Sequence, residues 1–350
     1  MLILKLSILI LLLSGCAKVA YLTEQGIGQV KLQWSGEDNK KLLKDPKFNE
    51  EWKQKIRLVE QYKKFFYEYY KIKPTKTYSE TSILKDEAVT YLVIASPHRE
   101  IKAHEFSFPI FGSFPYLGFF SEKSAKDFAA DLRKNENLVT WIRPVYAYST
   151  LGYLEDKILS SFFHYNDIEL AELVFHELFH TAFFVKDDVD LNENLADYFA
   201  VKMMPAYFES SDKFLRYQRI EKIRKRIYQH AVDKVAVLNA EFTKLGEQLT
   251  DSKADELTAT FSNEVLVPAL KNICAEEELT TEECEIKNNW NQAKLAAMLT
   301  YEEEQEFIEA LHTKLNVNNI EFLYWLKAKY KEYKRQDKHD NFTDYLKTYL

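Results

Sequence analysis

The sequence predicts a helix-dominated α+β protein, and three observations support this class. Glycine and proline are scarce, at 8 each in 350 residues, which favours long helices over tight turns. Apolar residues recur at helical intervals over most of the chain after residue 208, whereas short β-branched and aromatic runs cluster between residues 88 and 148. A hydrophobic content of 46% excludes a disordered chain. The net charge of -7 gives no indication of nucleic-acid binding.

The first residues have the organisation of an export signal. One positive charge, Lys5, precedes an apolar run at Leu6–Leu13 that is too short to span a bilayer. Leu13-Ser14-Gly15-Cys16 resembles a bacterial lipoprotein box, so we expect residues 1–15 to be removed and Cys16 to carry a lipid anchor in the membrane. No aspartate follows Cys16, which implies a cell-envelope position on the outer membrane, facing the periplasm, in a Gram-negative host. The alternative is an ordinary secretory signal in which Cys16 has no role.

Residues 16–45 are expected to form a polar, lipid-anchored tether and a short first element. Lys47–Ile72 has the pattern of a long amphipathic helix with these side chains on one face: Phe48, Trp52, Ile56, Val59, Phe66 and Tyr70. Core packing is the expected role of this face, and membrane binding is the alternative.

A region of strands follows that helix. We expect strands at Ala88–Ala95, Glu105–Ile110, Tyr116–Phe120 and Leu138–Tyr148, with a turn at Gly112 and Pro115 and a helix at Ser121–Arg133. Because proline cannot donate to a ladder of backbone hydrogen bonds, Pro144 places the last of these strands at a sheet edge.

The segment Ala171–Ala200 carries the chemistry. His176-Glu177-Leu178-Phe179-His180 is an H-E-x-x-H motif inside a helical pattern whose apolar face contains Ile168, Ala171, Val174, Phe175, Leu178 and Phe179. Residues four apart lie above one another on a helix, so His176 and His180 present two imidazoles to one point, where Zn²⁺ fits. Glu177 lies one step round the helix and would reach water at the metal without being a ligand. The alternative is two surface histidines on an ordinary amphipathic helix.

A catalytic zinc site usually has three protein ligands, and a second helix offers the third. After a polar turn at Lys186–Asp190, Asn192 is expected as the N-cap of that helix, from which Glu193 would face the two histidines. Asp197 lies one helical turn further on and would accept the distal N–H of a ligand histidine. The expected site is therefore one Zn²⁺ per chain, held by His176, His180 and Glu193, with Asp197 behind a histidine.

The remainder of the chain is predicted to be helical. Apolar residues keep helical spacing from Tyr217 to Phe242, and we expect further helices at Asn291–Leu311, Ile320–Lys334 and Asn341–Leu350. The first helix carries a basic run, Arg216, Arg219, Lys222, Arg224, Lys225 and Arg226, for which a solvated face is expected and contact with anionic lipid is the alternative. Cys274 and Cys284 flank an acidic loop. In an oxidising compartment we expect them to form a disulfide, and two unpaired buried thiols are the alternative.

H-E-x-x-H followed by Asn-Glu-x-x-x-Asp resembles the thermolysin-like clan of zinc peptidases, the gluzincins. The wider chain resembles the bacterial "putative aminopeptidase" family of lipid-anchored zinc proteins, through blocks at residues 21–29, 108–120, 147–152, 171–200 and 291–301. That family reads Phe-Asn-Glu-Ser around the third ligand, whereas this chain has Leu191-Asn192-Glu193-Asn194. The resemblance implies a zincin-like catalytic domain over residues 46–207, with a small β-sheet over the HExxH helix, and a helical C-terminal subdomain over residues 208–350 that closes the cleft.

The function expected from the motif is a zinc metallopeptidase acting on peptide or protein substrates, and the resemblance implies an aminopeptidase. Glu177 would be its general base. In the clan that the chain resembles, an extended substrate pairs with an edge strand beside the metal, and the Tyr148 hydroxyl would stabilise the developing oxyanion; the alternative is an ordinary core or surface tyrosine. Two other functions remain open. They are a zinc endopeptidase acting on envelope proteins and a lipid-anchored binding protein that keeps the zinc fold without turnover.

Overall fold

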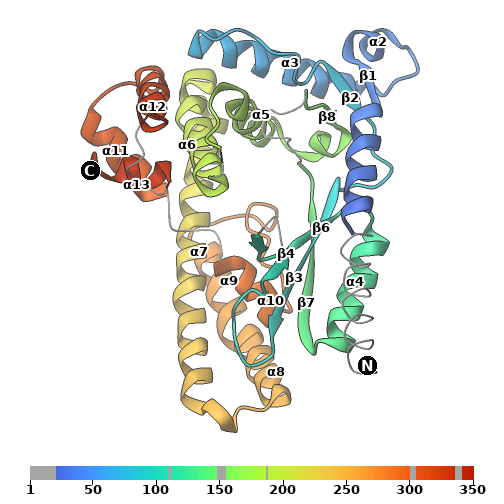
Figure 1. The fold of residues 1–350 in the computed structure, drawn as a ribbon, viewed down its shortest axis with the longest axis vertical. Coiled ribbons are helices and arrows are strands. Elements are labelled where there is room, and N and C mark those ends of the chain that lie inside the picture. Colours follow the sequence, from blue (N-terminus) through green and yellow to red (C-terminus); the bar gives the residue numbers. More distant parts are fainter. Residues whose placement is uncertain (1–20, 109–111, 148–154, 187, 300–304, 336–340) are drawn as a thin grey trace, which may run out of the picture.

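The computed structural model describes residues 21–108, 112–147, 155–186, 188–299, 305–335 and 341–350 (Figure 1). These residues form many helices and a few short sheets, so the helix-dominated α+β class predicted from the sequence is confirmed. Within these residues, none of the helices combines the length and the apolar character that crossing a bilayer would require.

The strands are short. They are β1 (Gly36–Asp38), β2 (Glu80–Ser82), β3 (Thr90–Pro97), β4 (Phe106–Phe108), β5 (Gly112–Phe114), β6 (Leu117–Phe119), β7 (Leu138–Val145) and β8 (Ile158–Leu159). The helices of the first two thirds are α2 (Asn39–Lys44), α3 (Glu50–Tyr70), α4 (Glu122–Asn135), η1 (Ser160–His164), α5 (Asp167–Ala182), α6 (Val189–Phe208), α7 (Asp212–Leu245) and η2 (Gly246–Gln248). The remaining helices are α8 (Asp251–Thr260), the π-helical η3 (Phe261–Leu266), α9 (Val267–Glu276), α10 (Gln292–Leu299), α11 (Gln305–Leu315), α12 (Asn319–Tyr333) and α13 (Phe342–Lys347).

The N-terminal helix, residues 21–34, replaces most of the polar tether that we expected over residues 16–45. Its inner face packs on the protein body: the Tyr21 ring centroid lies 5.2 Å from that of Phe119, and Leu32 contacts the main core. A side chain at position 28 would overlap the Phe120 ring, so Gly28 permits this close approach. Three polar residues on the partly buried side, Glu24, Gln25 and Gln29, break the apolar periodicity and explain why the pattern did not reveal a helix.

The main hydrophobic core lies where α3, α5 and α6 meet (Figure 1). The Asn49 side chain accepts a hydrogen bond from the Trp52 N–H and begins α3, close to the predicted Lys47–Ile72. Ile56 and Val59 are fully buried, as are Phe66 and Tyr70 on the same face. The predicted aromatic face of this helix therefore packs in the core and is not available to a membrane.

The C-terminal helices return to this same core. Figure 1 shows α11–α13 beside α6, while α8–α10 lie beside α7. The Phe199 ring on α6 is stacked between Phe179 of α5, at 4.5 Å, and Phe322 of α12, at 5.5 Å. A second core, which includes Val235 and Leu270, joins α7 to α8–α10. The main core thus contains residues from both sides of residue 208, where we expected a subdomain to begin.

The largest described sheet has the strand order β6-β3-β7, and all neighbours are antiparallel. β7 lies at its edge, as Pro144 predicted, with Tyr91 as the partner of this proline. One face of the sheet packs on α4 and the other on α10. The helix with the HExxH motif, α5, packs mainly against α3 and α6, so the structure differs from the expected sheet over that helix. The difference arises because residues 292–299, which are distant in sequence, occupy the sheet face.

The turn expected at Gly112 and Pro115 is partly a strand. Gly112–Phe114 forms β5, which pairs with β4 in a hairpin of its own. A strand of three residues is too short to show an alternating pattern, and this is the physical reason for the missed element.

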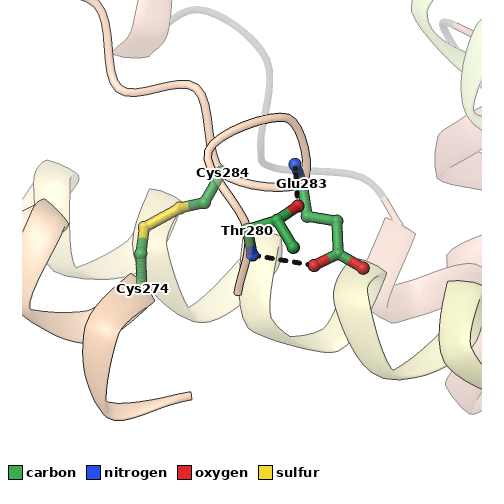
Figure 2. Close-up of a disulfide and its surroundings, with 4 residues drawn as sticks. All are labelled: Cys274, Thr280, Glu283 and Cys284. Atoms are coloured by element: carbon green, nitrogen blue, oxygen red, sulfur yellow. Dashed lines mark hydrogen bonds between the residues drawn. A yellow bond between two sulfur atoms is a disulfide. The ribbon is translucent and has the colours of Figure 1, made fainter. Parts of the chain in front are cut away.

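A disulfide joins Cys274, in α9, to Cys284, with the two Cα atoms 6.1 Å apart (Figure 2). Between them, the Thr280 N–H donates to Glu283 at 2.8 Å and the Glu283 N–H donates to the Thr280 hydroxyl at 3.3 Å. Arg216 binds the Glu283 carboxylate through two hydrogen bonds of 2.9 and 2.8 Å, which lowers the pKa of Glu283 to about 2.

Four of the six residues in the basic run on α7 form ion pairs with carboxylates of the protein. Arg219 and Arg226 both contact Glu277, with a distance of 2.7 Å from Arg226, and Arg224 pairs with Glu221 at 2.6 Å. Five of the six basic residues, all except Arg216, are nonetheless exposed, so the run forms the solvated face that we expected, with surface ion pairs on it. The segment between Cys274 and Cys284 supplies the carboxylates that pair with Arg216, Arg219 and Arg226.

Candidate metal centre

The first two candidate ligands lie on α5, whose start is fixed by the local sequence. The Asn166 side chain accepts hydrogen bonds from the N–H groups of Ile168 and Glu169, each at 3.0 Å, and the Glu169 carboxylate accepts from the Asn166 N–H at 3.3 Å. Such a capping box typically stabilises a helix by about 1 kcal/mol. The apolar face that the sequence predicted is buried at five positions: Ala171, Val174, Phe175, Leu178 and Phe179. The capping box fixes the start of α5 and the buried face fixes its rotation, and His176 and His180 lie one turn apart on it.

The third candidate ligand lies on α6, which begins earlier than we expected. Asp188 is the N-cap and accepts a hydrogen bond from the Leu191 N–H at 3.3 Å, so the prediction of Asn192 as the cap was wrong. Asn192 is buried inside the first turns, where its side chain accepts from the Val185 N–H at 2.8 Å and donates to the carbonyls of Val185 and Asp188, each at 2.7 Å. Asn192 therefore ties the turn between α5 and α6 to the helix that carries the next residue, Glu193.

The ligand atoms of the three residues converge. The Nε2 atoms of His176 and His180 are 3.3 Å apart, and the Glu193 carboxylate oxygens lie 3.3 Å from His176 Nε2 and 3.5 Å from His180 Nε2. Four ligands at 2.0–2.1 Å around a tetrahedral Zn²⁺ would be roughly 3.3–3.4 Å from one another. Among the described residues, this is the one cluster of three histidine, cysteine or carboxylate side chains able to share a metal ion. The spacing and the N, N, O donor set both fit zinc.

Asp197 fixes the orientation of one imidazole. Its Oδ1 lies 2.6 Å from His176 Nδ1, the nitrogen that does not face the cluster. A carboxylate only accepts hydrogen bonds, so Nδ1 carries a proton and Nε2 can direct a lone pair towards His180 and Glu193. The structure thus places Asp197 in the position behind a histidine that the sequence predicted.

The charges in the cluster oppose one another in a way that a cation would resolve. Burial and the neighbouring His176 lower the pKa of His180 to about 4, so His180 stays neutral, as a metal ligand must. Burial also disfavours charge on His176, but the carboxylates of Asp197 and Glu193 outweigh it and raise its pKa well above the ordinary value. Burial opposes ionisation of Glu193 as well, yet the two histidines lower its pKa. The carboxylates of Asp197 and Glu193 therefore favour a proton on His176, and a cation bound at the cluster would take the place of that proton.

Glu177 lies beside the cluster but supplies none of its three ligand atoms. The side chain is 7% exposed, and its negative charge contributes to the raised pKa of His176. It also adds to the raised pKa of Tyr165, for which burial is the larger cause. A buried carboxylate within electrostatic reach of the ligands is suited to accept a proton there. Tyr148 and Cys16 lie outside the described residues.

Sequence reasoning missed one partly buried carboxyl near the site, that of Glu172. Glu172 lies one helical turn before His176 and accepts a hydrogen bond from Tyr217 of α7. Burial raises its pKa, and the nearby carboxylates of Glu221 and Asp197 raise it further. Both Glu172 and Asp197 border a cavity of about 780 Å³ between α6, α7 and α11. The signal available in the sequence was a glutamate four residues before a ligand histidine, on the same helix face.

Comparison with known proteins assigns the chain to a family. Searches among curated proteins and among solved structures gave no match to the chain. The model of one protein family, described as "Putative aminopeptidase", matches residues 20–341, a span that includes the N-terminal helix, the whole ligand cluster and α12. The chain belongs to this family.

Proposed function

We propose that the protein is a zinc-dependent metallopeptidase of the HExxH type and acts as an aminopeptidase. The observation that carries the proposal is the convergence of His176, His180 and Glu193, whose ligand atoms are separated by 3.3 to 3.5 Å. The family description supports peptidase activity and the removal of residues from an N-terminus. Glu177 supports catalysis rather than a structural metal, because a closed structural site has no need of a buried carboxylate beside its ligands.

The residues of the chain divide the chemistry among them. A bound zinc ion would lower the pKa of water from about 15.7 towards 7 and polarise the scissile carbonyl. Glu177 takes one proton from the attacking water as the oxygen bonds to the carbonyl carbon, and passes that proton to the leaving nitrogen as the C–N bond breaks. Asp197 holds His176 in the tautomer that keeps its Nε2 lone pair on the cluster. One water is consumed; the second proton of that water also ends on the leaving nitrogen, so the products are a carboxylate and an ammonium group.

A position at the cell envelope belongs to the same proposal. Its support is the export signal before Cys16 and the disulfide between Cys274 and Cys284, since disulfides persist in oxidising compartments. The anchor would be a lipid on Cys16, and the outer membrane facing the periplasm is the proposed location in a Gram-negative host.

The proposed function is tested with one peptide in two forms. The purified protein should contain about one zinc per chain and release residues in order from the N-terminus of an unblocked peptide. It should not cleave the same peptide after N-acetylation, because an aminopeptidase needs the free α-ammonium group. Internal cleavage of the acetylated peptide would make the protein an endopeptidase instead. A zinc-loaded protein that cleaves neither peptide would be a binding protein.

Asp197→Asn should weaken zinc binding by roughly 10–100-fold while the protein stays folded. The amide is a weaker acceptor than the carboxylate and does not favour one imidazole tautomer as strongly, so His176 Nε2 loses orientation. Zinc affinity is measured by competition with a chromogenic chelator, and folding by circular dichroism. Asp190→Asn, at an exposed position in the first turn of α6, is the matched control and should not change the affinity. Equal affinities for the two variants would remove Asp197 from the site.

A further inference from the structure

The N-terminal helix has an apolar outer face. Seven of its residues are exposed, and they recur in adjacent pairs every four residues, as one face of a helix does. Four of them are large and apolar: Leu22, 43% exposed; Ile27, 51%; Val30, 45%; and Trp34, 83%. The other three are Thr23, Gly26 and Lys31. This outer face therefore contains one positive charge and no carboxylate, in a chain whose net charge is -7.

The helix cannot bury this face by rotating about its own axis. Its opposite face is already held, because Tyr21 packs on Phe119 and Leu32 contacts the main core. The close approach of Gly28 to Phe120 fixes the rotation as well. The described residues that follow the helix are also attached to the body, since β1 pairs with β2 over three residues. Packing therefore sets the orientation of this helix, which is the dark blue helix in Figure 1, and leaves the outer face exposed.

The position of this face in the chain indicates what covers it. The described part of this helix starts at residue 21, which is five residues after the expected lipid attachment at Cys16. Five residues reach at most roughly 18 Å when extended, so a lipid on Cys16 would keep residue 21 within about that distance of the membrane surface. Tryptophan is favoured at the boundary between water and lipid, and one lysine without opposing carboxylates suits anionic head groups.

We propose that the outer face of the N-terminal helix, formed by Leu22, Ile27, Val30 and Trp34, lies in the interfacial layer of a lipid bilayer. The lipid on Cys16 would supply the attachment, and contact of this face with the bilayer would set the orientation of the protein on the membrane. The inference rests on the export signal and the expected anchor, and not on the metal centre. Its failure would therefore leave the proposed peptidase activity untouched.

The test uses the full-length lipidated protein in vesicles of phosphatidylethanolamine and phosphatidylglycerol. The fluorescence of Trp34 is obtained as the difference between the wild type and Trp34→Phe, and vesicles with brominated acyl chains act as the quencher. We expect the brominated lipid to remove more than half of the Trp34 signal and iodide in the aqueous phase to have little effect. Ile27→Ser with Val30→Ser should restore at least half of the lost signal. Leu215→Ser with Val237→Ser, two apolar positions 49% and 67% exposed on α7, is the matched control and should not.

Three results would overturn the proposal. Quenching of Trp34 by iodide but not by brominated lipid would show a face that stays in water. Shielding from both quenchers, together with a disulfide-linked dimer of Ile27→Cys, would show that a second copy of the chain covers the face. Shielding from both quenchers without a dimer would assign the face to another segment of the same chain.

Discussion

Glu177→Gln is expected to keep its zinc and to lower kcat by about 10²–10⁴-fold. The amide has nearly the same shape as the carboxylate, so packing around this 7%-exposed side chain should be preserved. The amide cannot accept a proton from the attacking water, however, and the reaction loses its general base. The measurement is kcat for an unblocked peptide, with the zinc content determined on the same sample.

Glu169→Gln is the matched control for this experiment. It makes the same change on the same helix, and glutamine at this third position of a capping box still accepts from the Asn166 N–H. The control should retain kcat within a few-fold. If Glu177→Gln stayed within tenfold of the wild type while holding zinc, another group would have to take the proton.

Glu193→Ala is expected to leave almost no zinc after dialysis, compared with about one zinc per chain in the wild type. Two imidazoles with their Nε2 atoms 3.3 Å apart would remain, without the anionic oxygen that completes the set of protein ligands. Because a ligand that binds only the folded state stabilises it, added zinc should raise the Tm of the wild type and not that of the variant. Elemental analysis and thermal unfolding with and without zinc are the two measurements.

Asp190→Ala is the control for Glu193→Ala, since it removes an exposed carboxylate less than one turn earlier on the same helix. It should keep both the zinc content and the Tm shift. If Glu193→Ala retained stoichiometric zinc, the third ligand would be a different residue, and the His2Glu site proposed from these distances would be wrong.

Local patterns predicted what depends on local spacing. The intervals in residues 47–72 gave α3 and its buried face, and Pro144 gave the edge position of β7. The first two candidate ligands could be chosen in the same way, because a spacing of four residues places His176 and His180 on the same face of one helix. The structure then brings Glu193 to them from a helix that the sequence also predicted.

Long-range packing could not be predicted in this way. No pattern in α5 indicates that α3 rather than a sheet covers it, because an apolar helix face is the same whatever packs on it. The polar glutamines of the N-terminal helix hid its periodicity, and its attachment depends on the Phe119 ring, which is 98 residues from Tyr21 in the sequence. The sequence around Asn192 is typical of a helix cap. Its side chain instead bonds to the backbone of Val185, and this depends on the path of the turn between α5 and α6, which the sequence pattern does not specify.

The stacking of Phe199 between Phe179 and Phe322 has a consequence for the timing of assembly. All three candidate ligands leave the ribosome before residue 200, yet α6, which carries Glu193, gains one of its aromatic neighbours only when α12 follows more than a hundred residues later. The neighbouring Tyr198 of α6 likewise needs a distant partner, because its hydroxyl hydrogen-bonds to His312 at 2.7 Å. A product shortened before α11 would therefore carry all three candidate ligands and still lack two of the contacts that hold α6 in place.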